Sequence, residues 1–449
     1  MGEAADRLLK LAEAEDRFDI PFEDLDQAQI EAVDERFRER REAIRLLDRR
    51  AEEAGLDGVR SREDVVPLLF PHTAYKSYPE NFLTAGRWDR LGRWLDTVST
   101  YRVPPLDADA IGDIDDWVAA LQRSGHHVSC SSGTTGKSAM LVASAADMDW
   151  CRRETISSFA WGTGVVPAQD RRLIGTGAVA TVPRNTVTGQ AYLTALQDPA
   201  HEPFRPPVPP ITVGALTSMA VLRKAVADGT AKPDDLRRFE ETSAERARAM
   251  EAAVELAAEA AIEARTDKLH VGGLWANAYK LARAVRDKGY SGSDFHPENS
   301  MYVGGGLKRA VLPPDYKEFV FETFNISPER LYQNYAMQEL HSAMPRCQKG
   351  QRYHVPPWLV PLVLDAEGEN VLPATGEVEG RAAFVDLSID GRWGGVISGD
   401  KVQLDFGPCA CGNRGPSVRD DVVRYADLAD GDDKIGCAGT VDAYVRGIA

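Results

Sequence analysis

A ten-residue stretch from Ser129 to Ser138 constrains the fold of this chain more than any other. It reads SCSSGTTGKS, follows residues 126–128, which are typical of a strand end, and precedes the apolar run 139–142. Its two glycines permit backbone angles that other residues resist. Loops of this kind point main-chain N–H groups at an anion. Further donors are Lys137 and the hydroxyls of Ser131, Ser132, Thr134 and Thr135. The stretch predicts a polyphosphate-binding loop; an ordinary Gly/Ser/Thr turn is the alternative.

The loop does not fit the commonest phosphate-loop pattern. That pattern, G-x-x-x-x-G-K-[ST], requires a glycine where this chain has Ser131, which disfavours a P-loop phosphotransferase. Residues 131–137 instead match [ST]-[SG]-G-T-T-G-K, which resembles the phosphate loop of the adenylate-forming superfamily: acyl-CoA synthetases, nonribosomal peptide adenylation domains and luciferases. The resemblance implies a catalytic role for Lys137. It also implies that ATP phosphates are bound by Ser131, Ser132, Gly133, Thr134, Thr135 and Gly136.

Length and composition are those of a soluble globular protein. The 449 residues suffice for two or three domains, and 43% are hydrophobic and 27% charged. A formal net charge of −16 argues against nucleic-acid or anionic-membrane partners. We find neither a leader peptide nor an apolar run of ~18 residues, so we expect a cytoplasmic protein. Six cysteines in such a chain favour thiols or metal ligands over disulfides.

The patterning predicts α/β layering. The first 60 residues are charged and helical in character, with a long helix over 26–53 and an amphipathic helix over 88–98. Further on, β-branched runs alternate with turns and helical stretches, which indicates largely parallel strands. The expected strands in this part cover 172–175, 178–182 and 211–213. A long helix with one solvated face is expected over 233–268, and Pro361 favours an edge strand over 358–365.

Three later segments follow in the order that the superfamily has them. The first is a strand that ends in Gly304, Gly305 and Gly306, whose backbone the resemblance places against adenine; a plain strand-end turn is the alternative. The second, QNYAMQE over residues 333–339, resembles the family's Y-G-x-T-E. The third, ISGD, ends at Asp400 and resembles the family's T-G-D. The resemblance implies that Asp400 accepts hydrogen bonds from both ribose hydroxyls.

The second segment carries the metal ligand. The resemblance implies that Asn334 and Tyr335 bind the nucleotide, with Tyr335 stacked on adenine. It also implies that Glu339 holds Mg²⁺ between phosphates, because a hard cation prefers carboxylate and phosphate oxygens. Gln338 stands where the family has a Thr that touches the α-phosphate. An amide donates two hydrogen bonds, so we assign Gln338 to the catalytic set in that place.

The closest subfamily resembles phenylacetate–CoA ligase, in which C-P-C-G-R follows the T-G-D stretch. In this chain, residues 407–414 have the sequence GPCACGNR. Some relatives carry a Cys and a His upstream and bind zinc. The resemblance implies a closed structural Zn²⁺ site of three thiolates and one imidazole, made by Cys347, His354, Cys409 and Cys411. Free buried cysteines are the alternative; His341 is a second candidate nitrogen ligand and Cys437 a weaker sulfur ligand.

The chain ends soon after a partial match to the family's hinge. Residues 430–436 read DGDDKIG, with Asp430 where the family has Arg, and the sequence stops at Ala449. We therefore expect the family's mobile C-terminal domain, with its lysine, to be nearly absent. Three options stay open: a separate C-terminal polypeptide, adenylation without a second half-reaction, or loss of activity. Lys137 or Lys434 could stand in for the missing lysine.

The resemblance implies a fold and a domain plan. The fold is α/β: a large, multi-subdomain adenylate-forming N-terminal domain, with mixed sheets packed by helices and a β-rich last third. A helical region over 1–125 would pack on a core over 126–425, and 426–449 would be the remnant of hinge and C-terminal domain. The acid pocket would lie near residues 176–178, 272–275 and 306–307. Its contact residues would be His270, Trp275 and Asn277, each of which has a core alternative.

The function implied is an acid–AMP ligase that uses ATP and Mg²⁺. It would activate a carboxylic acid, an aromatic one if Trp275 contacts it, and release pyrophosphate. The acceptor of the acyl group is left open among CoA, a carrier-protein thiol and an amine, and a homodimer is left open too. The competing class is a non-catalytic nucleotide- and zinc-binding scaffold or partner-dependent subunit, which Gln338 and Asp430 favour.

Overall fold

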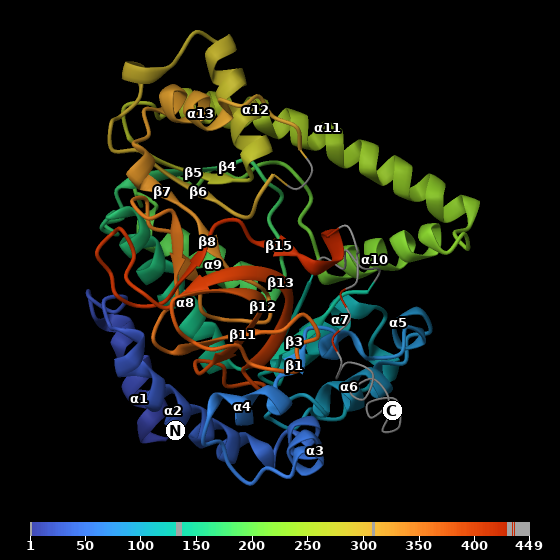
Figure 1. Ribbon diagram of the computed structural model, residues 1–449. Coiled ribbons are helices and arrows are strands. Elements are labelled where there is room, and N and C mark those ends of the chain that lie inside the picture. Colours follow the sequence, from blue (N-terminus) through green and yellow to red (C-terminus); the bar gives the residue numbers. More distant parts are fainter. Residues whose placement is uncertain (1, 132–136, 308–309, 429–432, 434, 436–449) are drawn as a thin grey trace. The chain divides into compact units, whose positions relative to one another are not determined.

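The structure is a computed structural model that describes residues 2–131, 137–307 and 310–428, with Asp433 and Ile435. The chain divides into two compact units. Figure 1 labels the helices and strands and colours them along the sequence. Unit 1 comprises Met1–Cys151, Val213–Val221 and Ala336–Ala449, and unit 2 comprises Arg152–Thr212 and Leu222–Tyr335. The boundaries at 125 and 425 stay predictions.

Helices dominate the beginning of unit 1. The helices α1 to α7 are, in order, Glu3–Lys10, Phe22–Arg41, Arg45–Ala54, Arg62–Val65, Asn81–Thr84, Trp88–Asp96 and Ile114–Arg123. Single 3-10 turns η1 to η7 are spread over both units, at Leu11–Glu13, Val66–Leu68, Ala74–Lys76, Ala108–Ala110, Gly292–Asp294, Pro328–Arg330 and Tyr425–Asp427. The helix expected over 88–98 is confirmed as α6.

The single helix expected over 26–53 is wrong, because α2 ends at Arg41 and α3 begins at Arg45. The buried stripe of α2 runs through Ile30, Val33 and Phe37. Its next two positions are Arg40 and Arg41, which offer no apolar side chain to bury. An amphipathic helix gains most of its stability from such burial, so the helix stops there.

A seven-stranded sheet forms the middle of unit 1. Its main path runs β10-β14-β13-β12-β11, with β1 parallel to β13 and β15 antiparallel to β13. The strands are β1 Phe70–Pro71, β10 Arg352–His354, β11 Leu359–Leu364, β12 Glu377–Asp386, β13 Gly395–Asp405, β14 Ser417–Arg419 and β15 Val423–Arg424. β11, which contains Pro361, ends the path as the predicted edge strand. This sheet confirms the β-rich last third.

Two further pieces of unit 1 bear on the site. β2 His127–Cys130 and β3 Met140–Ala143 pair antiparallel and form a hairpin around the predicted phosphate loop. The short strand β9 Met344–Pro345 precedes β10. The helix α8 Ala145–Thr163 begins in unit 1 directly after β3.

Unit 2 is built on a parallel sheet of order β4-β5-β6-β7, which confirms the predicted parallel pairing. The strands of this unit are β4 Arg171–Gly175, β5 Lys268–Gly273, β6 Ser300–Val303, β7 Leu331–Tyr332 and β8 Asn334–Tyr335. The helices that follow α8 are α9 Pro183–Leu196, α10 Val213–Ala227, α11 Pro233–Glu263, α12 Trp275–Asp287 and α13 Tyr316–Phe324. Side chains of α11, α12 and α13 pack on the sheet in one apolar core.

Two expected strands of unit 2 do not form. Residues 178–182 and 211–213 make only one isolated parallel bridge, between Ala180 and Ile211. The reason is local: α9 begins at Pro183, whose fixed φ suits the first helical turn, and α10 begins at Val213. The two helices limit the pairing after the bridge, and Pro209 and Pro210, which have no backbone N–H, limit it before the bridge.

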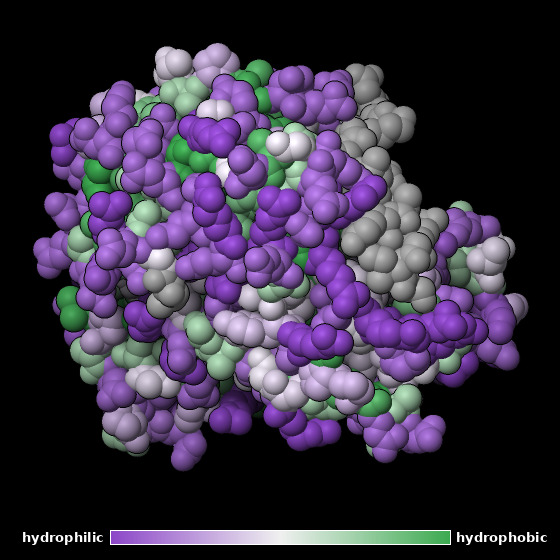
Figure 2. All heavy atoms as spheres, turned by 90° about the horizontal axis from the view of Figure 1, so that it is seen from below, coloured by the Kyte–Doolittle hydropathy of each residue, from purple (hydrophilic) through white to green (hydrophobic). Residues whose placement is uncertain are grey.

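The long helix expected over 233–268 is confirmed as α11, which buries only small and β-branched side chains of its second half, among them Ala257 and Ala261. Hydrophilic side chains cover most of the face drawn in Figure 2, with apolar residues scattered among them. Within the described ranges, no helix combines the length and apolar character needed to cross a bilayer.

Candidate functional site

The predicted phosphate loop is closed at its base. Beyond the last pair of β2 and β3, the Ser131 amide donates to the Ala139 carbonyl at 3.2 Å. The Ala139 amide donates in return to the Ser131 hydroxyl oxygen at 2.9 Å. Ser131 therefore holds the two ends of the loop together. The loop residues that lie outside the described part of the chain are Ser132, Gly133, Thr134, Thr135 and Gly136.

Lys137, at the exit of this loop, lies against Tyr78. Its ammonium contacts the Tyr78 carbonyl oxygen and sits 4.3 Å from the centroid of the Tyr78 ring, within the range of a cation–π interaction. The Tyr78 hydroxyl donates to the Ser138 carbonyl at 2.7 Å. The Trp94 ring packs edge-on against Tyr78 with centroids 5.0 Å apart. The lysine is thus held by a buried, braced aromatic side chain.

Glu339, the predicted magnesium ligand, lies in a turn of unit 1 whose main chain is bound by Arg392. The Arg392 guanidinium donates to the Glu339 carbonyl at 2.8 Å. The negative charge of Glu339 acts on Lys76 in η3. Burial lowers the pKa of the Lys76 ammonium, whereas the charge of Glu339 raises it. Gln338 precedes Glu339 and is half-buried. The turn therefore presents an anionic side chain next to a cation.

Asp400, the predicted ribose ligand, lies in β13 opposite Arg424 of β15. The two side chains form an ion pair of 3.7 Å, and the Asp400 amide donates to the Ser398 hydroxyl at 3.1 Å. The preceding Gly399 has a steric reason: a Cβ there would lie 2.8 Å from a carboxylate oxygen of Asp433. Any other residue here would require the Asp433 carboxylate to move.

Asp433 is one of two described residues of the hinge-like stretch, the other being Ile435, and it is bound to the body of unit 1. It receives hydrogen bonds from His72 at 3.1 Å and Arg381 at 2.8 Å. Burial alone would raise the pKa of its carboxyl, but these two partners bring it below the usual value. The hinge-like stretch therefore meets residues 72–78 as well.

Residues 72–78 connect the three predicted site residues of unit 1. Burial lowers the pKa of Lys76, Glu339 raises it and the like charge of Arg424 lowers it, and Arg424 pairs with Asp400. A Cβ on Gly399, the residue before Asp400, would lie 3.3 Å from His72 Nε2. Tyr78, two residues later, contacts Lys137. Lys137, Glu339 and Asp400 thus gather around one short segment. Neither Lys76 nor Tyr78 is among the residues assigned from the sequence; a lysine between two tyrosines, in Tyr75-Lys76-Ser77-Tyr78, was the available signal.

In unit 2, the carboxyl ends of three parallel strands are lined by glycine. β4 ends at Gly175, β5 at Gly272 and Gly273, and Gly304 follows β6, its amide bonded to the Gly273 carbonyl at 3.1 Å. A Cβ at Gly175 or Gly272 would meet no atom within 4 Å, so close packing is not what requires glycine there. Ligands of α/β proteins bind at this edge of the sheet.

Several predicted residues lie near these strand ends. Gly305 has a φ of 76°, which suits glycine, and Gly306 is exposed. Tyr335 is buried in β8 beside half-buried Asn334. Thr176, directly after β4, is fully buried. A Cβ on Gly273 would lie 2.8 Å from its hydroxyl oxygen.

The predicted acid-pocket residues have different surroundings. His270 is buried in β5, with Nδ1 3.0 Å from the Ser300 hydroxyl and its ring stacked on Tyr192 at 5.4 Å. Burial, and then the charge of Arg171, lowers the pKa of His270 to about 3, so the ring is neutral at pH 7. Trp275 is 2% exposed within the core of unit 2. Its ring centroid lies 5.1 Å from that of Tyr316, which corresponds to its core alternative.

The four predicted zinc ligands come together in unit 1. Cys347 and His354 belong to the segment that ends in β10, and Cys409 and Cys411 belong to a turn closed by the hydrogen bond from the Gly412 amide to the Cys409 carbonyl at 2.9 Å. All four ligand atoms lie within 4.8 Å of one another. The Sγ atoms of Cys347 and Cys409 are 3.7 Å apart, and His354 Nε2 is 3.3 Å from Cys411 Sγ.

This spacing fits a tetrahedral zinc ion. Two Zn–S bonds of about 2.3 Å at a tetrahedral angle place the sulfurs about 3.8 Å apart, close to the observed separation. Gly350 makes room for the cluster, because a Cβ there would overlap the Cys409 sulfur and lie 3.2 Å from the Cys347 sulfur. The Asn413 amide also donates to the Cys411 sulfur at 3.1 Å. Such donors favour a thiolate.

The second candidate nitrogen ligand lies elsewhere. The ring of His341 is 3.1 Å from Asp147 and 3.2 Å from Arg392 through its two nitrogens, and it is not in the cluster formed by the described residues. Cys437 falls outside the described residues.

Comparison with known proteins shows which solved structures have a similar fold. No family model matches the chain, and no curated protein matches it. The matching solved structures include three of 2-hydroxyisobutyryl-CoA ligase, each at 15% identity. The postadenylation state with R3-HIB-AMP has a TM-score of 0.52 over 91% of this chain and 69% of that one. The thioesterification state with 2-HIB-AMP and CoA has a TM-score of 0.56 over 92% of this chain and 70% of that one. An open conformation with the same ligands has a TM-score of 0.51 over 92% of this chain and 72% of that one.

At this level of identity the likeness establishes the fold and nothing finer. The α/β fold expected from the resemblance to the adenylate-forming superfamily is confirmed. The match extends over nine-tenths of the chain and therefore includes both units.

Proposed function

We propose that this chain activates a carboxylic acid as an acyl-adenylate, consuming ATP and releasing pyrophosphate. The observation that carries the proposal is the gathering of Lys137, Glu339 and Asp400 around residues 72–78 of unit 1. The fold supports it, since 2-hydroxyisobutyryl-CoA ligase, crystallised with 2-HIB-AMP and CoA, has the same architecture.

The chemistry asks for alignment and charge neutralisation. A carboxylate is ionised at pH 7 and needs no general base; it attacks the α-phosphorus, and pyrophosphate leaves with the electron pair of the broken P–O bond. In phosphoryl-transfer chemistry the protein contributes positioning and electrostatic stabilisation. We assign the phosphates to residues 131–137, the α-phosphate to Gln338 and Mg²⁺ to Glu339.

The nucleoside and acid are assigned within each unit. In unit 1, Asp400 binds the ribose. In unit 2, adenine is assigned to Gly304, Gly305, Gly306, Asn334 and Tyr335. The acid is assigned to the glycine-lined strand ends, near His270 and Asn277. Because Trp275 lies in the core, the aromatic-acid specificity loses the residue that suggested it, and it stays a proposal together with the phenylacetate–CoA ligase-like subtype.

We further assign a structural Zn²⁺ to Cys347, His354, Cys409 and Cys411. When bound, this ion would crosslink the segment after Glu339 to the turn after β13. The acceptor of the acyl group is proposed to be CoA, a carrier-protein thiol or an amine.

The test is pyrophosphate–ATP exchange over a panel of carboxylic acids. Exchange with at least one acid is expected, and Glu339→Ala should abolish it. Glu52→Ala, which removes an exposed carboxylate from α3, is the matched control and should exchange at the wild-type rate. If the protein binds ATP but shows no exchange with any of the acids, the proposed enzymatic activity is refuted. That result would support the non-catalytic scaffold, which Gln338, a departure from the family's Thr, favours.

A further inference from the structure

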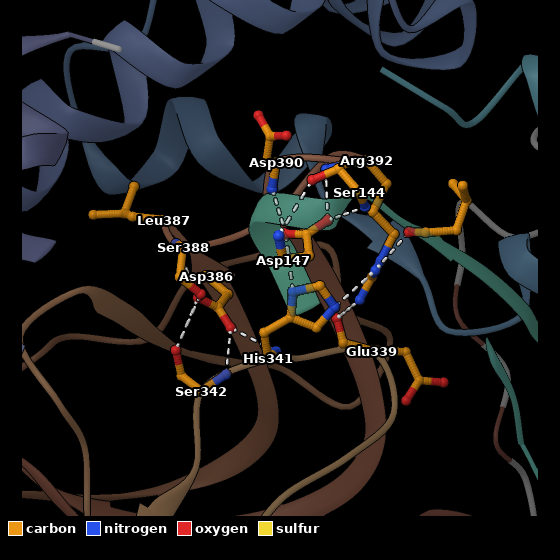
Figure 3. Close-up of polar contacts among 12 residues, drawn as sticks. Ser144, Asp147, Glu339, His341, Ser342, Asp386, Leu387, Ser388, Asp390 and Arg392 are labelled. Atoms are coloured by element: carbon orange, nitrogen blue, oxygen red, sulfur yellow. Dashed lines mark hydrogen bonds and ion pairs between the residues drawn. The ribbon is translucent and has the colours of Figure 1, made fainter. Parts of the chain in front are cut away.

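We propose that Arg392 is a positioning residue for Glu339, held in place by a buried relay through His341 and Asp147. The inference rests on the proposed function, in which Glu339 is the magnesium ligand. The relay joins three distant parts of unit 1: the start of α8, the turn after Glu339 and the loop before β13 (Figure 3).

Asp147 is the fixed end of the relay. Its carboxylate accepts from the Ser144 amide at 2.7 Å, while the Ser144 hydroxyl accepts from the Asp147 amide at 3.2 Å, a reciprocal cap on α8. The same carboxylate accepts from the amides of Asp390 at 2.7 Å and Gly391 at 2.8 Å. Asp147 is fully buried. Its carboxylate therefore holds the start of α8 and the loop before β13 together away from solvent.

His341 transmits this constraint to Arg392. Its Nδ1 is 3.1 Å from Asp147 Oδ1, and its Nε2 is 3.2 Å from Arg392 Nη1. Because a guanidinium can only donate, Nε2 must accept, and the ring hydrogen on Nδ1 goes to Asp147. This orientation leaves the imidazole no rotational freedom.

Arg392 ends the relay on the main chain of Glu339. Its guanidinium is 1% exposed and donates from Nη1 to the Val142 carbonyl at 2.8 Å and from Nη2 to the Glu339 carbonyl at 2.8 Å. Figure 3 shows the Glu339 carboxylate turned away from the relay. The backbone is therefore fixed while the carboxylate is directed elsewhere.

A second carboxylate fixes the other side of the same turn. Asp386, 1% exposed, accepts from the amides of His341 and Ser342 at 2.8 Å each. The main chain is thus bound at Glu339 and again two and three residues later. Buried ionic groups add little net stability compared with apolar packing. A buried relay that ends on the carbonyl of a candidate metal ligand fits positioning, as outer-shell partners do in metal sites.

The test compares two buried arginines. Arg392→Lys keeps the charge but cannot donate in the planar fork that reaches the carbonyls of Val142 and Glu339. Arg62→Lys is the control: Arg62 is 9% exposed and donates to the Pro361 carbonyl at 2.6 Å, and it belongs to no assigned site. For each variant, ATP affinity is measured by calorimetry with Mg²⁺ and with chelator, and exchange is measured against Mg²⁺ concentration.

We expect Arg392→Lys to need about tenfold more Mg²⁺ than wild type, in line with the usual effect of losing an outer-shell partner, with ATP affinity in chelator unchanged. Arg62→Lys should keep the wild-type Mg²⁺ dependence. If Arg392→Lys does not fold, His341→Gln, which leaves Arg392 in place, should shift the Mg²⁺ dependence in the same direction by less.

Equal Mg²⁺ dependence in the Arg392 and Arg62 variants would overturn the positioning role, as would wild-type ATP binding that is indifferent to Mg²⁺. Failure of the proposed function looks different: wild type would bind ATP more tightly with Mg²⁺ yet exchange with no acid. In that case the Mg²⁺ dependence of ATP affinity in Arg392→Lys, measured by calorimetry, still decides whether the relay positions Glu339.

Discussion

The hydroxyl of Tyr78 donates a 2.7 Å hydrogen bond to the carbonyl of Ser138, sixty residues later in the chain. Ser138 directly follows Lys137, so this bond fixes the exit of the predicted phosphate loop at the residue after its lysine. The ring of the same tyrosine lies under the Lys137 ammonium. One buried side chain therefore sets both the backbone and the charge at this end of the loop.

Tyr78→Phe is expected to lower the stability of the protein and its affinity for ATP together. The ring stays, but the Ser138 carbonyl loses its donor, which costs about 1–3 kcal/mol for a buried group. Denaturant unfolding and the KM for ATP measure the two effects. Trp88→Phe, which removes a 3.1 Å hydrogen bond to the Ile111 carbonyl, should cost similar stability and leave the KM unchanged. A KM that rises equally in both variants would contradict the assignment.

The Cys/His cluster is expected to carry about one zinc per chain in protein purified without chelator. Gly350→Ala should lower that content, because the added methyl would overlap the Cys409 sulfur. Cys411→Ser should lower it as well, by removing a ligand. Metal content measured by elemental analysis decides the matter.

The control for this prediction is Cys130→Ser, since Cys130 is buried in β2 outside the cluster. Its zinc content should equal that of wild type. Wild-type protein with near-zero zinc would remove the metal assignment, whatever the variants do.

The sequence predicts those parts of the molecule whose signal is local. Alternating β-branched runs and glycine turns predicted the parallel sheet of unit 2, and the resemblance to a C-P-C-G-R stretch pointed to Cys409 and Cys411, half of the cluster. Where local signals competed, the prediction was wrong: residues 178–182 look like a strand, yet Pro183 starts a helix at their end.

The relay of Asp147, His341 and Arg392 could not be predicted in this way. Its hydrogen bonds join residues 194 and 51 positions apart. None of the three stands in a phosphate or ribose motif, and His341 was named only as a second candidate zinc ligand. Only the folded arrangement of α8 and β13 brings them together. The motif residues themselves stay predictions until nucleotide binding is measured.

His270 makes stability depend on pH. Its pKa is lowered to about 3 in the folded chain by burial, while an unfolded histidine has a pKa of about 6.5. Between these values the unfolded state binds a proton that the folded state does not, so the free energy of unfolding falls as pH falls. The slope from this residue is at most about 1.4 kcal/mol per pH unit. Urea unfolding of wild type and His270→Asn from pH 7 to pH 4 should show a shallower slope in the variant; parallel curves would contradict the assignment.

Lys76 offers the sharpest test of the charge arrangement around Glu339, because two effects of removing it have opposite signs. The ammonium competes with any cation held by Glu339, with which it interacts, yet it attracts the phosphates of ATP. Lys76→Gln should therefore bind Mn²⁺, as a substitute for Mg²⁺, about fivefold more tightly in the absence of ATP, a change of roughly 1 kcal/mol. The same variant should bind ATP in chelator more weakly. Lys224→Gln, which removes an exposed lysine paired with Asp228 at 3.2 Å, should change neither affinity. If Lys76→Gln retains wild-type stability in urea unfolding and yet binds Mn²⁺ no more tightly than wild type, the assignment of Glu339 as a metal ligand beside a competing cation is wrong.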